Sequence, residues 1–281
     1  MKGLFIGLTT IDLQYVLPSF PATNSKHKTS QMQVDIGGPA TNAAATFACL
    51  GGDSEVCTMV GDHAWTFFIQ QEFRRYALRL WDLIPNESIL PPLASVWTTA
   101  DTGDRTIVVN QLASPQWSSS QLEELDWTGI EIVLVDGFHL EAAIPLAKIA
   151  RQRGIPVVFD GGSWKPGLPE LLPWVDMAIC SADFKVPGST SVFNGLRTFG
   201  IQSMAITQGS GPILLEILGK QHSIQVEKVP VVDTLGAGDV FHGAACMGWL
   251  KFGNWPKALK YASVIAGKSV QYVGAKTWIH E

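Results

Sequence analysis

Short apolar runs alternate with longer stretches of helical periodicity along most of this chain, and the alternation restricts the fold more than any other feature. The runs predicted as strands are residues 4–8, 55–60, 131–135, 156–159, 177–180 and 203–207, and the predicted helices are 42–50, 65–81, 140–153, 240–252 and 255–272. Strands that alternate with helices of this length form a mainly parallel sheet with helices on both faces. The sequence therefore predicts an α/β fold.

Two stretches interrupt this alternation. Residues from about 13 to 35 and from about 95 to 112 are rich in Thr, Gln and Val, and they alternate like strands without an intervening helix. We expect them to pair as a small antiparallel sheet that stands off the main body as a discontinuous lid, two separate edge hairpins being the alternative. The whole chain, 1–281, is then a single domain that carries this lid.

Composition excludes several classes of protein. With 46% apolar and 16% charged residues and a net charge of −5, the chain is neither disordered nor a coiled coil, and it has no basic stripe for nucleic acid. The four cysteines form no C-x-x-C pair, which disfavours a disulfide framework or a zinc site and fits a reducing compartment. No apolar run is long enough to span a membrane, and the N-terminal run is too short for a signal peptide. We therefore expect a cytoplasmic protein with no membrane partner.

A glycine-rich turn near the end of the chain is the strongest chemical signal. Residues 231–244 read VVDTLGAGDVFHGA, and we expect a strand ending at 229–232 to pass through this turn into the helix at 240. Gly236 and Gly238 allow N–H groups to converge beside the positive end of the helix dipole, which makes a pocket for an anion such as a phosphoryl group. Asp239 lies at its mouth, where a carboxylate can take the proton of a hydroxyl group, although the dipole is expected to lower its pKa. Taken alone, the turn is equally typical of an ordinary helix cap.

Other nucleotide-binding and catalytic motifs are missing. The G-x-G-x-x-G pattern fails because Phe241 stands where the third glycine would be, which argues against a dinucleotide-binding dehydrogenase. Residues 262–269, ASVIAGKS, are similar to a P-loop but lie within one predicted helix. No G-x-S-x-G elbow occurs, and the six histidines have no metal-ligand spacing. His242 is interpreted as an ordinary polar residue of the first helical turn.

An early diglycine gives a second signal. Residues 35–44, DIGGPATNAA, lead from an expected strand into a helix, and Asn42 at the start of that helix offers an amide donor and acceptor to a polyol. With these two motifs the chain resembles the ribokinase-like (PfkB) carbohydrate kinase family. The resemblance rests on GGPATNAA, on DTLGAGDVFHGA and on Thr207-Gln208-Gly209 between them, and it spans nearly the whole chain.

This resemblance implies a ribokinase-like three-layer α/β/α fold with a small β-sheet lid. It also implies an ATP-dependent kinase that transfers the γ-phosphoryl group to a sugar hydroxyl, with Mg²⁺ bridging the β- and γ-phosphates. No protein ligand is assigned to the metal. Carried over by position, the family's functional residues are the base Asp239, the anion hole Gly236, Ala237 and Gly238, the acceptor contacts Asp12, Gly37, Gly38 and Asn42, and the nucleotide contacts Thr207, Gly209, Gly211 and Ser263.

The sequence departs from the family pattern at two places. Residues 181–184, SADF, replace the Asn-x-x-Glu that often helps to organise magnesium and phosphates, and Asp183 is a carboxylate out of register. Residues 160–165, DGGSWK, replace Asp-x-Asn-x-Arg, and Lys165 is interpreted as a solvated lysine rather than one that steers phosphates. The retained Asp233 and Thr234 add K⁺ as a candidate monovalent cation.

Two alternative functions stay open on the sequence. One is a nucleoside kinase of the same fold, since Phe20, Trp97 and Val109 of the expected lid suit a base as well as a sugar. The other is a non-catalytic sugar sensor, to which the missing Asn-x-x-Glu would point, whereas the intact GAGD turn favours an enzyme. The resemblance further implies that the lid pairs between subunits, and hence a homodimer.

Overall fold

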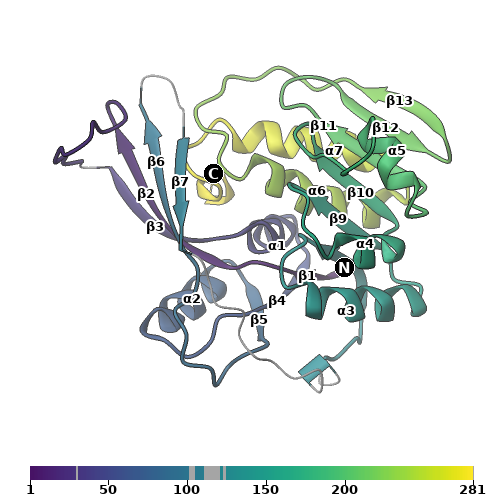
Figure 1. Cartoon of the computed structure of the whole chain (residues 1–281), viewed down its shortest axis with the longest axis horizontal. Coiled ribbons are helices and arrows are strands. Elements are labelled where there is room, and N and C mark those ends of the chain that lie inside the picture. Colours follow the sequence, from purple (N-terminus) through teal and green to yellow (C-terminus); the bar gives the residue numbers. More distant parts are fainter. Residues whose placement is uncertain (30, 101–104, 111–120, 123–124, 281) are drawn as a thin grey trace.

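A nine-stranded sheet forms the centre of the protein (Figure 1). The structure is a computed structural model, and it describes residues 1–29, 31–100, 105–110, 121–122 and 125–280. The strand order is β13-β12-β11-β10-β9-β8-β1-β4-β5. All neighbours from β11 to β5 are parallel, and β12 and β13 continue the sheet antiparallel at one edge. The strands are β1 (Lys2–Ile6), β4 (Asp53–Thr58), β5 (Leu78–Asp82), β8 (Ile130–Val135), β9 (Val157–Gly161), β10 (Met177–Ser181), β11 (Ser203–Thr207), β12 (Ile213–Ile217) and β13 (Lys220–Ile224).

Helices cover both faces of this sheet, because successive residues of each buried strand point to opposite faces and both must be shielded from water. In β1, Phe5 packs with α1, α6 and α7, whereas Leu4 and Ile6 pack with α3, α4 and α5. The predicted three-layer α/β/α fold is therefore confirmed. The helices are α1 (Pro39–Cys49), α2 (Ala64–Arg75), α3 (Leu140–Gln152), α4 (Leu168–Leu171), α5 (Val192–Arg197), α6 (Ala237–Phe252) and α7 (Trp255–Ser269), with short 3₁₀ turns η2 (Leu172–Trp174) and η3 (Thr277–His280).

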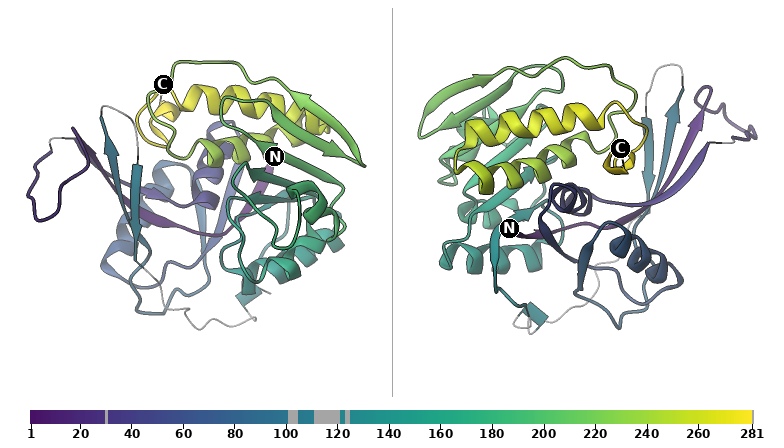
Figure 2. Two further views of the ribbon diagram at one scale, coloured as in Figure 1. Left: turned by 45° about the horizontal axis from the view of Figure 1, so that its top comes forward. Right: turned by 180° about the vertical axis from the view of Figure 1, so that it is seen from behind.

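A separate four-stranded sheet projects to one side of this body, as both views in Figure 2 show. It has the order β3-β2-β6-β7, from β2 (Thr10–Leu17), β3 (Met32–Gly37), β6 (Leu93–Thr99) and β7 (Arg105–Val109). Both segments expected to form a small sheet supply strands to it, although residues 30, 101–104, 111 and 112 of those segments lie outside the described residues. The central pair, β2 and β6, is parallel rather than antiparallel, because each follows a strand of the parallel sheet.

Two predicted elements are wrong. The helix expected over 65–81 ends at Arg75, because Ala77 takes a left-handed backbone conformation (φ 56°) and the chain continues as β5. The strand expected to end at 229–232 is an irregular segment, because Val231 and Val232 are 60% and 56% exposed and have no sheet to pack against. The other predicted elements agree with the structure apart from shifts at their ends.

The carboxyl ends of the parallel strands lie at one edge of the large sheet, where ligands bind in open α/β folds. The small sheet begins at this same edge, because β2 follows β1 after three residues. No helix among the residues that the structure describes is long and apolar enough to cross a membrane.

Candidate active site

The first turn of α6 has main-chain N–H groups without protein partners. Gly236 precedes the helix with φ 69°, a conformation that favours glycine. The N–H groups of Gly238 and Asp239 have no acceptor among the described residues, whereas the N–H of Ala237 donates to the carbonyl oxygen of Thr234 at 3.2 Å. A Cβ atom added to Gly238 would meet nothing within 4 Å. Free donors and the positive end of the helix dipole therefore face open space, which is the arrangement that binds an anion.

Asp239 is partly exposed, and its carboxylate belongs to a polar cluster drawn from several elements. Asn42 Nδ2 donates to Asp239 Oδ2 at 2.8 Å. Burial, followed by the neighbouring Asp160 carboxylate, raises the pKa of Asp239 to about 6, while the Asn42 hydrogen bond, His242 and Lys276 act in the opposite direction. The expectation that the helix dipole lowers this pKa is wrong, because the cost of desolvating the charged form is larger.

Asp12 of β2 lies against Gly37, just before the start of α1. Asp12 Oδ1 accepts a hydrogen bond from Thr10 Oγ1 at 2.6 Å, and burial raises the pKa of Asp12. A Cβ atom on Gly37 would lie 2.1 Å from Asp12 Oδ2, and one on Gly38, where φ is 94°, would lie 2.1 Å from the Leu8 carbonyl oxygen. The predicted residues Asp12, Gly37 and Gly38 are thus brought together, and both glycines are needed for the close packing.

One face of the small sheet is polar although it is largely buried. In β2, Thr10, Asp12 and Gln14 are at most 9% exposed, and the residues directly opposite in β3 are Gly37, Asp35 and Gln33. Opposed residues of an antiparallel pair project to the same face. The alternate positions Ile11, Leu13, Val34 and Ile36 belong to the hydrophobic core. Because buried polar groups need hydrogen-bond partners, this face suits a ligand with many hydroxyl groups.

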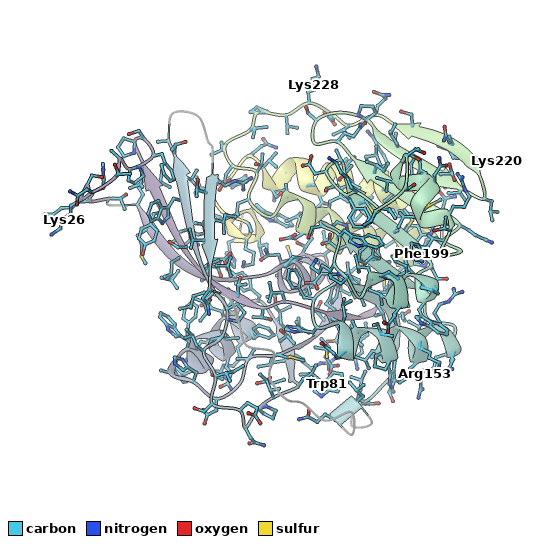
Figure 3. All side chains as sticks on the ribbon, in the orientation of Figure 1. Lys26, Trp81, Arg153, Phe199, Lys220 and Lys228 are labelled. Carbon is cyan, nitrogen blue, oxygen red and sulfur yellow. The ribbon has the colours of Figure 1, made fainter. Side chains whose placement is uncertain are left out.

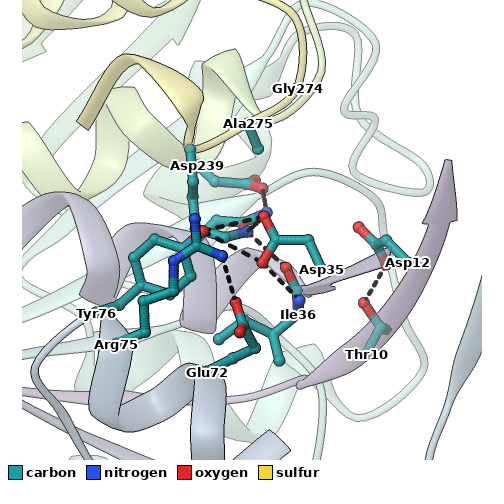
Figure 4. A network of polar contacts seen from close by, with 12 residues as sticks. Thr10, Asp12, Asp35, Ile36, Glu72, Arg75, Tyr76, Asp239, Gly274 and Ala275 are labelled. Carbon is teal, nitrogen blue, oxygen red and sulfur yellow. Dashed lines mark hydrogen bonds and ion pairs between the residues drawn. The ribbon is translucent and has the colours of Figure 1, made fainter. Parts of the chain in front are cut away.

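A buried lysine, Lys276, which no sequence motif indicates, joins the polar network in which Figure 4 draws Asp35, Tyr76 and Asp239. Lys276 Nζ donates to the Ile36 carbonyl oxygen at 2.5 Å and to Asn42 Oδ1 at 2.8 Å, and it lies 3.4 Å from Asp35 Oδ2. The hydroxyl group of Tyr76 donates to the Asp35 carboxylate. Asp35 and Lys276 stand 241 positions apart, so no local pattern in the sequence indicates the pair.

A second buried group lies where β9, β10 and α6 meet. The ring nitrogens of His242 lie 2.6 Å from the Gly238 carbonyl oxygen and 3.1 Å from that of Ile179, and Nδ1 lies 3.5 Å from Asp160 Oδ2. His242 is 4% exposed, so its interpretation as an ordinary polar residue of the first turn needs correction. It links the first turn of α6 to β10 and to the carboxylate of β9.

Lys165 is not the solvated lysine that the sequence suggested. It is half-buried, and its Nζ lies 4.2 Å from the centre of the Phe138 ring. Burial lowers the pKa of Lys165, and Asp136 and Asp160 act in the opposite direction. The side chain therefore brings a cation to the edge of the sheet that holds Asp160.

Three of the predicted nucleotide contacts lie together at the end of β11. Thr207 Oγ1 donates to the Cys180 carbonyl oxygen at 3.4 Å, and Gly209, with φ 58°, has open space where a Cβ atom would be. The N–H of Gly211 closes the turn on the Gln208 carbonyl oxygen at 2.9 Å. Ser263 comes from α7, and its Oγ donates to the Lys260 carbonyl oxygen. In the described part of the chain it shares no hydrogen bond with this turn.

A protein holds a metal ion on its own through a cluster of ligating side chains. Across residues 1–29, 31–100, 105–110, 121–122 and 125–280, no group of three or more His, Cys, Asp or Glu side chains is placed to hold a metal ion. Asp183, after β10, is exposed. Magnesium commonly binds through substrate phosphates and water with only one or two protein ligands.

Comparison with known proteins gives matches over nearly the full length. The sequence model of the family described as "pfkB family carbohydrate kinase" matches residues 2–281. Deoxyribokinase of Salmonella typhi is 22% identical over 97% of this chain and 93% of its own. Ribokinase of Arabidopsis thaliana, solved with ribose and ATP, has a TM-score of 0.81 at 22% identity over 99% and 94% of the two chains. The nucleoside kinase of Methanocaldococcus jannaschii has a TM-score of 0.76 at 19% identity over 98% and 93%.

Proposed function

Because this chain belongs to the pfkB family of carbohydrate kinases, we propose that it transfers the γ-phosphoryl group of ATP to a hydroxyl group of a sugar, with Asp239 as the general base. The observation that carries the proposal is the juxtaposition of a partly exposed carboxylate and free main-chain N–H groups in the first turn of α6. A base and an anion site within one helical turn can act on the two ends of the bond that forms.

The proton and phosphoryl movements follow from this placement. The acceptor hydroxyl gives its proton to an oxygen of Asp239, its oxygen forms a bond to the γ-phosphorus, and the bond from that phosphorus to the β–γ bridging oxygen breaks to release ADP. A pKa near 6 keeps Asp239 mostly ionised at neutral pH and makes it a stronger base than an ordinary aspartate.

The anion hole is proposed at residues 236–238, except that the N–H of Asp239 takes the place of that of Ala237 as a donor. The N–H groups of Gly236, Gly238 and Asp239 are free among the described residues, whereas that of Ala237 is bonded to Thr234. Ala237 would therefore shape the turn while the other three donate to the phosphoryl oxygens. Fixed donors of this kind stabilise developing negative charge without reorganising during the reaction.

A sugar acceptor is supported by the polar face of the small sheet. Asp12 and Asn42 would bind hydroxyl groups beside Asp239, with Gly37 and Gly38 allowing close approach. Thr10, Gln14 and Gln33 extend the polar surface along β2 and β3. A nucleobase would instead need an apolar slot. We propose that the small sheet acts as a lid over the acceptor and so excludes water from the reaction.

The nucleotide is proposed to lie along the turn formed by Thr207, Gly209 and Gly211, with Ser263 on its adenine side. Mg²⁺, when bound with ATP, neutralises charge on the β- and γ-phosphates. A K⁺ ion near Asp233 and Thr234 would share these groups with Arg105, whose guanidinium contacts both.

We further propose a homodimer that forms through the small sheet. Its outer strand β7 has the exposed apolar side chains Ile107, Val108 and Val109, which a partner would cover. A cytoplasmic location is proposed because the reaction consumes ATP and all four cysteines are free thiols.

The substitution Asp239→Asn tests the function. Turnover of ATP with a panel of sugars and nucleosides should identify the acceptor, and the variant should lower kcat for that acceptor by about 10² or more, as loss of a general base does. Its ATP Kd, measured by calorimetry, should stay near that of the wild type. The exposed Asp126→Asn is the matched control. Near-normal turnover of Asp239→Asn would remove Asp239 from the mechanism, and turnover restricted to nucleosides would remove the sugar assignment.

A further inference from the structure

Lys276 is the lysine with the most unusual surroundings in the described part of this protein. Lys26, Lys220 and Lys228 project from the periphery of the molecule (Figure 3), whereas Lys276 is 1% exposed. An ammonium group has three N–H donors and no acceptor. Three oxygens surround it, those of Ile36, Asn42 and Asp35, so every donor has a partner. Burial of a charge is costly without such partners, which makes an incidental position improbable on physical grounds.

The contact determines which way the Asn42 amide faces. Because the ammonium group can only donate, the amide atom beside it must be the oxygen Oδ1, at 2.8 Å. The amide nitrogen therefore faces Asp239 Oδ2, at 2.8 Å, and donates to it. A flipped amide would place N–H against ammonium and oxygen against carboxylate, so both contacts would be lost.

This orientation has a chemical consequence at Asp239. A donor at Oδ2 favours the ionised carboxylate and leaves Oδ1 without a side-chain donor among the described residues. The Asn42 nitrogen has a second hydrogen, which remains available to an oxygen of the acceptor. The chain of contacts from Lys276 through Asn42 therefore fixes both the base and one acceptor contact.

We infer that Lys276 is a positioning residue of phosphoryl transfer, whose buried ammonium group fixes the Asn42 amide so that the amide holds Asp239 toward the acceptor hydroxyl. This inference rests on the proposed function, in which Asp239 is the base. Asp35 and the hydroxyl group of Tyr76 support the ammonium group from the opposite side.

Charged groups from several elements surround Asp239 and Lys276. They determine how the removal of Lys276 would change the protonation of Asp239. Asp160 of β9 and His242 of α6 face Asp239. Lys276 lies 3.4 Å from Asp35 of β3, and both residues interact electrostatically with Asp12 of β2. Without the ammonium charge, the carboxylates dominate this surrounding, so protonation of Asp239 becomes easier and the acid limb of the rate profile should move to higher pH.

The test is the substitution Lys276→Met, which keeps an unbranched side chain and removes the donors and the charge. We expect kcat for the acceptor to fall at least about tenfold, because a misplaced base loses its alignment. The acid limb of kcat/KM should move up by about half a pH unit or more. The ATP Kd should stay within about twofold, since Lys276 contacts no residue of the nucleotide turn. The exposed Lys257→Met on α7 is the matched control.

A second variant covers the case in which Lys276→Met does not fold. The double substitution Asp35→Asn with Lys276→Met removes both buried charges, so neither is left unpaired. It should fold and still show the lower kcat, with an upward shift of the acid limb that is smaller than in Lys276→Met because the negative charge of Asp35 is removed as well. The inference requires both the lower kcat and the shifted acid limb. A folded variant that shows only one of these effects, or neither, overturns it.

Failure of this inference differs from failure of the proposed function. If Asp239→Asn abolishes turnover while the Lys276 variants keep the wild-type profile, only the positioning role is lost. If Asp239→Asn retains turnover, the base assignment fails first, whatever the Lys276 variants do.

Discussion

The charged form of Asp239 is destabilised by the same surroundings that would make this residue a stronger base in the proposed reaction. Burial raises its pKa to about 6, against about 3.9 in an unfolded chain. The folded protein therefore binds the proton more tightly. The stabilisation of the fold by this bound proton is fully present below about pH 4 and is lost as the pH rises through about 6. Across this range the free energy of unfolding falls by roughly 3 kcal/mol at most.

Asp239→Asn should for this reason stabilise the protein at neutral pH. The amide stays uncharged and can still accept the hydrogen bond from Asn42. In denaturant titrations the free energy of unfolding of the variant should exceed that of the wild type at pH 7.5, and the difference should shrink at pH 5. A difference that does not change with pH would show that Asp239 titrates like a solvent-exposed carboxylate.

The same pKa predicts the pH dependence of the reaction. Because the base must be ionised, kcat/KM should rise with pH through about 6 and reach a plateau near pH 7, so its value at pH 5 should be about one tenth of the plateau. Steady-state rates in a constant-ionic-strength buffer series measure this. A midpoint near pH 4 would contradict the effect of burial described for this carboxylate.

Some site residues could be predicted from sequence because they lie in compact motifs. Gly236, Gly238 and Asp239 share one turn, and Asn42 follows a diglycine. Lys276 could not be predicted, since its partners are distant in the sequence and a lone lysine is usually exposed. The predicted direction of the Asp239 pKa shift is wrong because a helix dipole can be inferred from sequence, whereas the depth of burial cannot.

At the scale of single elements, two glycines at the start of α6 have different roles: Gly238 leaves space open, whereas Gly236 adopts a backbone conformation that favours glycine. Gly238→Ala places a methyl group in open space within the first helical turn, where alanine is favoured over glycine by roughly 0.5–1 kcal/mol. We expect unchanged or raised Tm with a clear loss of kcat/KM for ATP, because the methyl group occupies the proposed phosphoryl site.

Gly236→Ala is the matched comparison. It forces φ near 69° on a residue with a Cβ atom and places that atom 2.6 Å from Ala275 Cβ. This variant should lose stability by about 1–3 kcal/mol, as judged by thermal melting. Equal melting temperatures for the two alanine variants would contradict the conformations described for the turn.

The elements themselves were mostly predictable, and the exceptions have physical reasons. Buried parallel strands such as β8 and β10 consist mostly of short apolar runs, so they could be located closely. The boundary between α2 and β5 was missed because Ala77 shows no glycine or proline signal for its positive φ. The apolar residues 229–232 suggested a strand, but only tertiary packing decides whether such a run is buried.

At the scale of the whole molecule, Arg105 joins the small sheet to the turn before α6. Its guanidinium donates to Thr234 Oγ1 at 2.7 Å and lies 3.5 Å from Asp233 Oδ1. Asp233 also accepts from the N–H groups of Leu235 and Gly274, so this carboxylate organises the turn that leads to the proposed anion site. Arg105 therefore connects the small sheet to the approach of the proposed phosphoryl site.

Arg105→Ala should weaken this connection with little effect on stability. A partly exposed ion pair contributes about 1 kcal/mol or less, so Tm should change by only a few degrees. If the small sheet closes over the acceptor, KM for the acceptor should rise several-fold, and ATP hydrolysis without acceptor should increase relative to transfer. Coupled assays of ADP release and sugar phosphate formation measure both, with the exposed Arg74→Ala as the control. Unchanged coupling would show that the bridge has no part in closure.

The residues of the proposed site lie far apart in the sequence, and this has a consequence for the protein while it is being made. Asn42 emerges from the ribosome first, whereas its partners Asp239 and Lys276 follow roughly two hundred residues later. A growing chain that lacks α6 has neither the carboxylate nor the main-chain N–H groups of the proposed phosphoryl site. Such chains should therefore be unable to waste cellular ATP, and turnover should begin only after α6 and Lys276 have been made.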